Sequence, residues 1–178
     1  NNGSSLLRAV ATDGHRLASA DLPMPEGAEG MPGVIVPRKA VLEIRKLIDE
    51  SADEVNVGLS DTKIKFSFAG TTLTSKLIDG TFPDYDRVIP EGNDKILEVE
   101  TELFAQAVDR VSAISAEKSR AVKLSISKGN LILSANSAEN DTANETIQVD
   151  YDDSEIEIGF NSRYLLDIAQ QITGDKVR

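Results

Sequence analysis

The sequence predicts an α+β fold whose sheets are mostly antiparallel. Six short runs alternate apolar and polar residues, are rich in β-branched side chains and end at turn residues, as expected of strands. Three other stretches have helical spacing. Ala69-Gly70 and Lys128-Gly129-Asn130 are typical hairpin connections. The predicted strands are 55–59, 63–68, 72–78, 122–126, 131–135 and 156–160, and the predicted helices are 37–50, 101 to about 115 and 161 to about 173.

The first predicted helix has two chemically opposite faces. At 100° per residue, its apolar side chains fall in one sector, which we expect to face the core. Its basic side chains fall in the opposite sector. A solvated face is the simpler interpretation, but bases near a helix N-terminus oppose the macrodipole, which favours another role for them. The apolar set is Ala40, Val41, Ile44, Leu47 and Ile48, and the basic set is Arg38, Lys39, Arg45 and Lys46.

The other two helices carry little positive charge. Their opposite faces hold only Arg110 and Arg163 as bases. The residues predicted to be buried are Leu103, Phe104, Ala107, Val108, Val111 and Ile114 in the second helix, and Tyr164, Leu165, Ile168 and Ile172 in the third.

An internal similarity relates the first and third helices. Residues 36–44 and 160–168 both read as the end of a strand followed by an amphipathic helix, with an offset of 124 residues. Two complete units of that length would exceed the 178 residues of the chain. We therefore expect a repeated architecture of which this sequence is one piece.

Composition limits the function classes. The chain is 40% hydrophobic and 28% charged, which is typical of a soluble globular protein. We expect neither a membrane span nor a signal segment, and the absence of cysteine excludes disulfides and thiolate chemistry and suits the cytoplasm. Thirty acidic against nineteen basic residues give a net charge of −11. A generally basic nucleic-acid-binding surface is disfavoured, although one local basic face is compatible with this total.

The single histidine invites a catalytic interpretation that has little support. His15 follows Asp13 by two residues, but the sequence has no G-x-S-x-G elbow, and Asp13-Gly14 is an ordinary turn dipeptide. It also lacks a Walker A loop and the ligand spacing of an EF-hand. We expect no catalytic residue, metal or cofactor. An enzyme centred on His15 and Asp13 remains one alternative, and an extracellular β-rich adhesion or carbohydrate-binding module is another.

A connector lies in the middle of the chain. Residues 81–90 contain two prolines, two aromatic side chains, an arginine and two apolar residues, and the segment is too kinked for a central strand. Such a segment suits either an apolar peptide-docking surface or a stiff interdomain linker, and its sequence supports both equally. Turn-forming residues 90–94 follow it, so we predict domains at 1–93 and 94–178.

Four motifs, in order along the chain, resemble one family. They are A-T-D-G-H-R-L-A at 11–18, V-I-V-P-R-K at 34–39, S-K-L-I-D-G-T-F-P-D-Y at 75–85 and I-G-F-N at 158–161. Together they resemble the bacterial replicative sliding clamp, the DNA polymerase III beta subunit family. The resemblance implies a DNA-clamp fold, in which two subunits of three similar domains form a ring with helices lining the hole. It places this chain in the later middle domain and the first part of the third.

The resemblance also implies roles for individual residues. The family is a non-catalytic processivity factor that encircles duplex DNA without sequence specificity, and it holds polymerase, clamp loader and repair proteins through short peptides. The peptide pocket would use Thr12, Gly14, His15, Arg16, Leu17, Pro83, Arg87 and Val88, together with family positions that have no counterpart here. Arg38 and Lys39 would face DNA, to which helical geometry adds Arg45 and Lys46. The dimer interface would include Ala113, Ile114, Glu139, Asp141 and Glu145.

Overall fold

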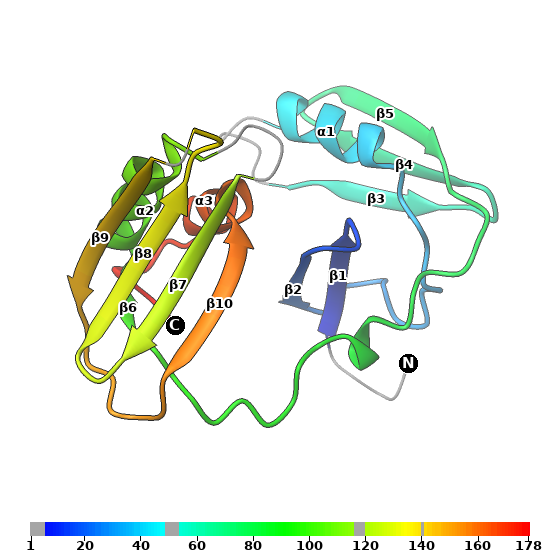
Figure 1. Ribbon diagram of the computed structural model, residues 1–178. Helices are drawn as coiled ribbons and strands as arrows, with labels where there is room; N and C mark the ends of the chain where they lie inside the picture. Colours follow the sequence, from blue (N-terminus) through cyan, green and yellow to red (C-terminus); the bar gives the residue numbers. More distant parts are fainter. Residues whose placement is uncertain (1–5, 49–53, 116–119, 140) are drawn as a thin grey trace. The chain divides into compact units, whose positions relative to one another are not determined.

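The chain forms two compact units in a computed structural model that describes residues 6–48, 54–115, 120–139 and 141–178. Unit 1 spans residues 1–89 and unit 2 spans residues 90–178. Each contains antiparallel strands and at least one helix, so the predicted α+β class is confirmed (Figure 1). The finer division into domains 1–93 and 94–178 stays a prediction.

Unit 1 contains two small antiparallel sheets and one helix. The strands β1 and β2 form a hairpin, and β3, β4 and β5 form a three-stranded meander in that order (Figure 1). The segment before α1 is tied to the segment that follows β5, because Ile78 donates its N–H to the Ile35 carbonyl at 2.9 Å. The elements are β1 (Leu6–Thr12), β2 (Leu17–Pro23), α1 (Arg38–Leu47), β3 (Asn56–Leu59), β4 (Lys63–Phe68), β5 (Thr71–Lys76) and the 3-10 helix η1 (Tyr85–Arg87).

The apolar face predicted for the first helix is only partly buried. Ala40 is buried, but Val41 is 51% exposed and Leu47 is 47% exposed. Hydrophobic periodicity identifies which side of a helix is apolar and does not by itself supply a covering element. The prediction that this whole face is buried is therefore wrong at Val41 and Leu47.

Unit 2 has a larger antiparallel sheet, in which the strand order is β10-β7-β8-β9, and a short pair formed by β11 and β6 (Figure 1). The pairing of β10 with β7 links the second half of the unit to the first. Its elements are β6 (Val99–Glu100), α2 (Thr101–Ser112), β7 (Ala121–Ser127), β8 (Asn130–Asn136), β9 (Thr142–Gln148), β10 (Ile156–Asn161), α3 (Ser162–Ala169) and β11 (Lys176–Val177).

The core of unit 2 lies between α2 and the four-stranded sheet. Val108 of α2 and Leu131 and Leu133 of β8 have no exposed surface. Two predicted core positions are wrong: Leu103 is 38% exposed and Ile168 is 47% exposed. Leu103 lies at the rim of a cavity, and α3 buries Ala169 in place of its neighbour Ile168.

The helices are shorter than predicted but keep the 124-residue offset, since α1 begins at Arg38 and α3 at Ser162. The Asn161 side chain caps α3 by accepting from the Arg163 N–H at 3.0 Å. Pro37 precedes α1 without a side-chain cap, and the segment before it is not a strand. The two copies are therefore alike in helix position and different in how the helix starts. Within the described residues, no helix is long and apolar enough to span a membrane.

Candidate functional site

The turn between β1 and β2 carries five of the predicted pocket residues. Thr12 ends β1 and pairs with Leu17, the first residue of β2. Gly14 has φ of +85°, a left-handed conformation that glycine adopts without strain. The Thr12 hydroxyl donates to the Arg16 carbonyl at 2.8 Å and accepts from the Gly14 N–H at 3.2 Å. The sequence therefore builds a defined turn that presents its side chains at one end of the hairpin.

Asp13 holds this turn through its carboxylate. Oδ1 accepts the backbone N–H groups of His15 and Arg16, both at 3.1 Å, and Oδ2 accepts from Arg16 Nε at 3.0 Å. The His15 and Arg16 backbone hydrogen bonds lower the pKa of Asp13, with a smaller contribution from the Arg16 side chain. The carboxylate thus holds together the turn backbone and the Arg16 side chain.

The connector carries the remaining predicted pocket residues. Pro83 and Arg87 are exposed, and Val88 is 69% exposed, which is unusual for a valine in a folded unit. Asp84 pairs with Arg87 Nε at 2.8 Å, and the rings of Phe82 and Tyr85 meet edge to face, with centroids 6.2 Å apart. The connector is therefore an ordered surface with an uncovered apolar residue.

Both segments belong to unit 1. In the hairpin that carries the turn, Arg8 of β1 forms a two-pronged ion pair with Asp21 of β2. In Figure 1, η1 lies beside the end of β1. Sequence analysis did not single out Arg8 and Asp21, although the hairpin register around the Asp13-Gly14 turn would have placed Arg8 opposite Asp21.

The four basic residues of α1 are all exposed. Lys46 pairs with Glu43 at 3.1 Å, so part of its charge is neutralised within the helix. Because α1 ends at Leu47, Arg45 and Lys46 fall in its last turn, where the macrodipole favours cations. This corrects the expectation that all four bases oppose the dipole. Only Arg38 and Lys39 oppose the dipole. A role other than helix stability is therefore more strongly indicated for these two residues.

The predicted interface residues lie at one end of unit 2. Ala113 is the exposed C-cap of α2, and Ile114 is half-buried against the core. Glu139 and Asp141 lie in the β8–β9 turn, where the Ser137 hydroxyl accepts both of their N–H groups at 3.1 and 2.9 Å. This turn leaves both carboxylates exposed to solvent.

Glu145 differs from the other two acids, because it is held within its own unit. Arg110 of α2 donates to Glu145 of β9 through two nitrogens, with Nε to Oε2 at 3.0 Å. The Arg110 hydrogen bonds lower the pKa of Glu145. The negative charge of Glu145 is therefore largely neutralised by Arg110 within the same unit.

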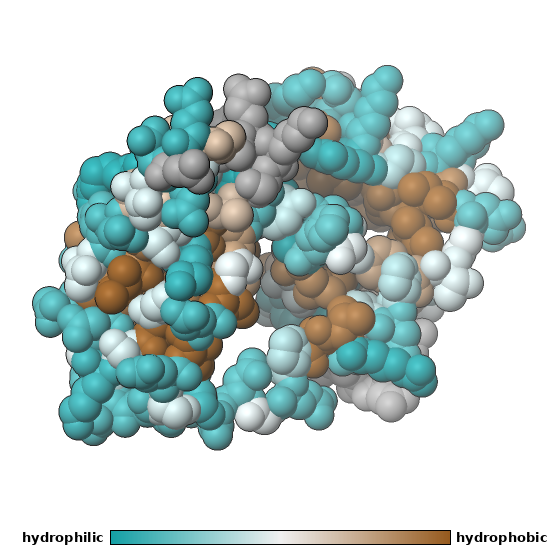
Figure 2. All heavy atoms as spheres, in the orientation of Figure 1, coloured by the Kyte–Doolittle hydropathy of each residue, from teal (hydrophilic) through white to brown (hydrophobic). Residues whose placement is uncertain are grey.

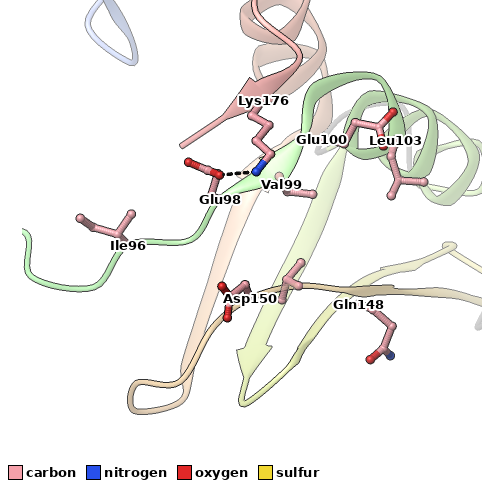
Figure 3. A pocket seen from close by; sticks show the side chains of 9 residues that line it. Ile96, Glu98, Val99, Glu100, Leu103, Gln148, Asp150 and Lys176 are labelled. Carbon is pink, nitrogen blue, oxygen red and sulfur yellow. Dashed lines mark hydrogen bonds and ion pairs between the residues drawn. The ribbon is translucent and has the colours of Figure 1, made fainter.

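A cavity of about 450 Å³ lies in unit 2 and is lined by none of the predicted site residues (Figure 3). Lys176 and Glu98 form an ion pair at its wall, with Nζ 2.7 Å from Oε1, and this pair lowers the pKa of Glu98. Ile96 and Leu103 supply apolar wall. Sequence analysis did not predict this cavity, because apart from Leu103 of α2 its walls come from β6, β9, β11 and the residues beside them, and none of these strands was predicted.

Comparison with known proteins identifies the family. The sequence profile of the DNA polymerase III beta subunit, central domain, matches residues 1–84, and that of its C-terminal domain matches residues 86–178. The chain belongs to the DNA polymerase III beta subunit family. The resemblance found in the four motifs is thereby confirmed, and family membership supports neither the His15 enzyme nor the extracellular module.

Individual clamp relatives agree with this placement. The beta sliding clamp of Caulobacter vibrioides is 55% identical over 172 residues, which cover 97% of this chain and 46% of that protein. The Pseudomonas aeruginosa clamp is 42% identical over 177 residues, which cover 99% and 48%. The chain therefore spans about half the length of the clamps that it matches.

Solved clamp structures share the fold. The Caulobacter crescentus beta sliding clamp has a TM-score of 0.92 at 56% identity, covering 98% of this chain and 47% of that one. The Bartonella birtlesii DnaN sliding clamp bound to griselimycin has a TM-score of 0.92 at 55% identity, covering 96% and 46%. The predicted clamp-domain fold is confirmed.

Proposed function

We propose that this chain forms part of a cytoplasmic sliding clamp, a non-catalytic ring that encircles duplex DNA and raises the processivity of a DNA polymerase. The observation that carries the proposal is the consecutive match of two clamp domains along nearly the whole chain. Two subunits would close the ring head to tail. A closed ring retains DNA by topology, so it needs no sequence-specific contact.

Within this proposal, Arg38 and Lys39 face the DNA phosphates, with Arg45 and Lys46 one to two turns further along α1. Four bases in a chain of net charge −11 give one weakly attractive surface on an otherwise repulsive molecule. Weak phosphate attraction suits sliding, because strong contacts would slow movement along the duplex.

The β1–β2 turn and the connector form part of a pocket for the short peptides of polymerases, the clamp loader and repair proteins. The exposed Val88 gives such a peptide an apolar contact, and Arg87 gives it a cation. Support comes from the clamp structures of Bartonella birtlesii and Pseudomonas aeruginosa, both of which are bound to griselimycin.

The subunit interface would use Ala113 and Ile114 as its apolar contact and the β8–β9 turn as its acidic edge. Since Arg110 already offsets Glu145, we expect Glu139 and Asp141 to supply most of the attraction to a basic partner surface. The modest side chain of Ala113 leaves Ile114 as the larger apolar group.

Griselimycin titration tests the pocket. In the full-length gene product that carries this chain, Val88→Ala should weaken griselimycin binding measured by calorimetry, by about tenfold, which corresponds to about 1.4 kcal/mol. Lys65→Ala, which alters an exposed residue of β4 in the same unit, serves as the control and should bind normally. Equal affinity of Val88→Ala and the unaltered protein would contradict the pocket.

Charge reversal tests the DNA-facing surface. Arg38→Glu with Lys39→Glu should shorten the retention of the loaded clamp on circular DNA at low salt, and the difference should shrink as salt rises. The matched control is Lys63→Glu with Lys65→Glu, which makes the same charge change on β4. If both pairs behave alike, only net charge matters and the assignment of α1 to DNA is wrong.

A further inference from the structure

The sequence contains the dipeptide Asp-Gly twice, in two different settings. Asp13-Gly14 lies in the turn between β1 and β2, and Asp79-Gly80 lies in the irregular segment between β5 and the connector. An aspartate followed by glycine is prone to attack on its side-chain carboxyl by the next main-chain nitrogen, because glycine has no Cβ to hinder the approach. All four residues are exposed to solvent, so exposure does not distinguish the two dipeptides.

Hydrogen bonds hold both reacting groups of the first dipeptide. The Asp13 carboxylate accepts from the backbone N–H groups of His15 and Arg16 and from Arg16 Nε. The Gly14 N–H, whose nitrogen would attack, donates to the Thr12 hydroxyl at 3.2 Å. These bonds must break before the Gly14 nitrogen can reach the carboxyl carbon of Asp13. The backbone hydrogen bonds also lower the pKa of Asp13, which keeps its carboxyl in the ionised, less electrophilic form.

Neither reacting group of the second dipeptide is held in this way. Within residues 6–48, 54–115, 120–139 and 141–178, no hydrogen bond or ion pair joins the Asp79 carboxylate or the Gly80 N–H to another residue. A Cβ placed on Gly80 would meet no atom within 4 Å, so the space around its nitrogen is open. The two groups can therefore rotate toward each other without breaking another contact.

We propose that Asp79-Gly80 is a site of spontaneous isomerisation to isoaspartate, and that the β1–β2 turn protects Asp13-Gly14 from the same reaction. The Gly80 nitrogen attacks Asp79 Cγ and forms a C–N bond, and one carboxyl oxygen leaves as water with the N–H proton and the carboxyl proton. Water then cleaves the bond between the Asp79 main-chain carbonyl carbon and the Gly80 nitrogen. Its hydroxyl stays on that carbon and its proton returns to the nitrogen, so the product has the same atoms as the original chain.

The reaction lengthens the main chain by one atom, because the chain then runs through Cβ and Cγ of Asp79 in place of its main-chain carbonyl carbon. Directly before the site, the Ile78 N–H is bound to the Ile35 carbonyl at 2.9 Å. Shortly after the site, the rings of Phe82 and Tyr85 pack edge to face. The added atom therefore falls between an anchored residue and an ordered ring pair, and it alters the spacing between the β3–β5 meander and the connector.

Peptide mapping of the full-length gene product tests the proposal. After incubation for days at mildly acidic pH, mass spectrometry with electron-transfer fragmentation distinguishes isoaspartate from aspartate at each position. In the folded protein, isoaspartate should accumulate about tenfold faster at Asp79 than at Asp13, because hydrogen bonds hold only the second of these. In urea, the two positions should react at similar rates. Mapping is necessary because Asn2-Gly3, which lies outside the described residues, can also yield isoaspartate by deamidation.

Gly80→Ala is the matched control, because it adds a methyl group that hinders the attacking nitrogen and meets no atom within 4 Å in the folded chain. It should lower isoaspartate formation at Asp79 several-fold and leave the rate at Asp13 unchanged. An unchanged rate at Asp79 would show that the Gly80 nitrogen is not the attacking group. Equal rates at the two positions in the folded protein would overturn the proposal. The same tenfold difference in urea would also overturn it, since local sequence and not the fold would then explain the difference.

Discussion

The two units of this chain differ in how they are held together. Unit 2 has a continuous apolar core between α2 and a four-stranded sheet. In unit 1, the buried hydrophobic residues are Ala40, Ile64 and Phe68 among those that the structure describes, and its turns are secured mainly by polar groups. Hydrophobic surface remains visible on the molecule in Figure 2. Similar amphipathic patterns thus give a packed core in unit 2 and a partly exposed apolar face of α1 in unit 1.

Core truncation should show the largest difference between the units. Leu131→Ala removes a side chain with no exposed surface from β8, so we expect a loss of about 3 to 5 kcal/mol in the free energy of unfolding of unit 2. Val41→Ala alters a half-exposed residue of α1 and should change stability by about 0.5 kcal/mol or less. Chemical denaturation measures both. Similar losses at the two positions would mean that α1 is covered as fully as β8.

A backbone substitution in the hairpin should have the next largest effect. A Cβ at Gly14 would meet no atom within 4 Å, so Gly14→Ala is opposed only by the positive φ, at a cost of about 1 to 2 kcal/mol. Gly159→Ala in β10 of unit 2 is the control, since that glycine has neither a positive φ nor a close neighbour. Amide exchange in β1 and β2 reports the loss. Unchanged protection would show that the turn tolerates another conformation.

Acid should loosen the β1–β2 hairpin, which two carboxylates hold together. The pKa values of Asp13 and Asp21 are lowered in the folded chain, Asp13 by backbone hydrogen bonds and Asp21 by Arg8. Their stabilisation is therefore complete above the unfolded pKa of about 3.9 and is lost as pH falls through the folded values.

Hydrogen exchange of the hairpin at pH 6 and below pH 4, corrected for intrinsic rates, measures this change. Asp21→Asn should flatten the response of the hairpin and leave α2 and β8 unaffected. A hairpin that stays equally protected at both pH values would show that its carboxylates contribute nothing.

The smallest expected effect concerns the stability of unit 2 at high pH. Burial raises the pKa of Tyr151, and the nearby Asp153 carboxylate raises it further. The Tyr151 hydroxyl donates to the Ser154 carbonyl at 2.6 Å. A raised folded pKa means that stabilisation is present below the unfolded value of about 10 and is lost as pH rises through the folded one. Ultraviolet titration should show a late-ionising component, which Tyr151→Phe removes. A late component that persists in Tyr151→Phe would contradict this assignment.

The sequence predicted those helices and strands whose residues favour the secondary structure that they adopt. The alternation in β7 and β8 predicted those strands, because their side chains alternate between core and solvent. The same pattern predicted β10, although most of its side chains are exposed. It missed β2, which contains Ser19, Asp21 and Pro23, residues that are poor in strands. That strand exists because the preceding turn aligns it with β1.

The candidate site was predictable only in its parts. The turn and the connector were identified from their sequences, but the Arg8–Asp21 ion pair joins two strands that were not predicted. Likewise, the Arg110–Glu145 pair connects a helix with a strand that was not predicted, so the difference between Glu145 and its acidic neighbours could not be foreseen.

The antiparallel register of β1 and β2 limits how the loop between them can change. Thr12 faces Leu17 and Arg8 faces Asp21, so the span from residue 13 to residue 16 sets every later pairing. One inserted or deleted residue there would slide β2 along β1 and turn alternate side chains to the opposite face. Substitutions in this loop can thus be absorbed individually, whereas a change in its length would separate Arg8 from its carboxylate in a single step.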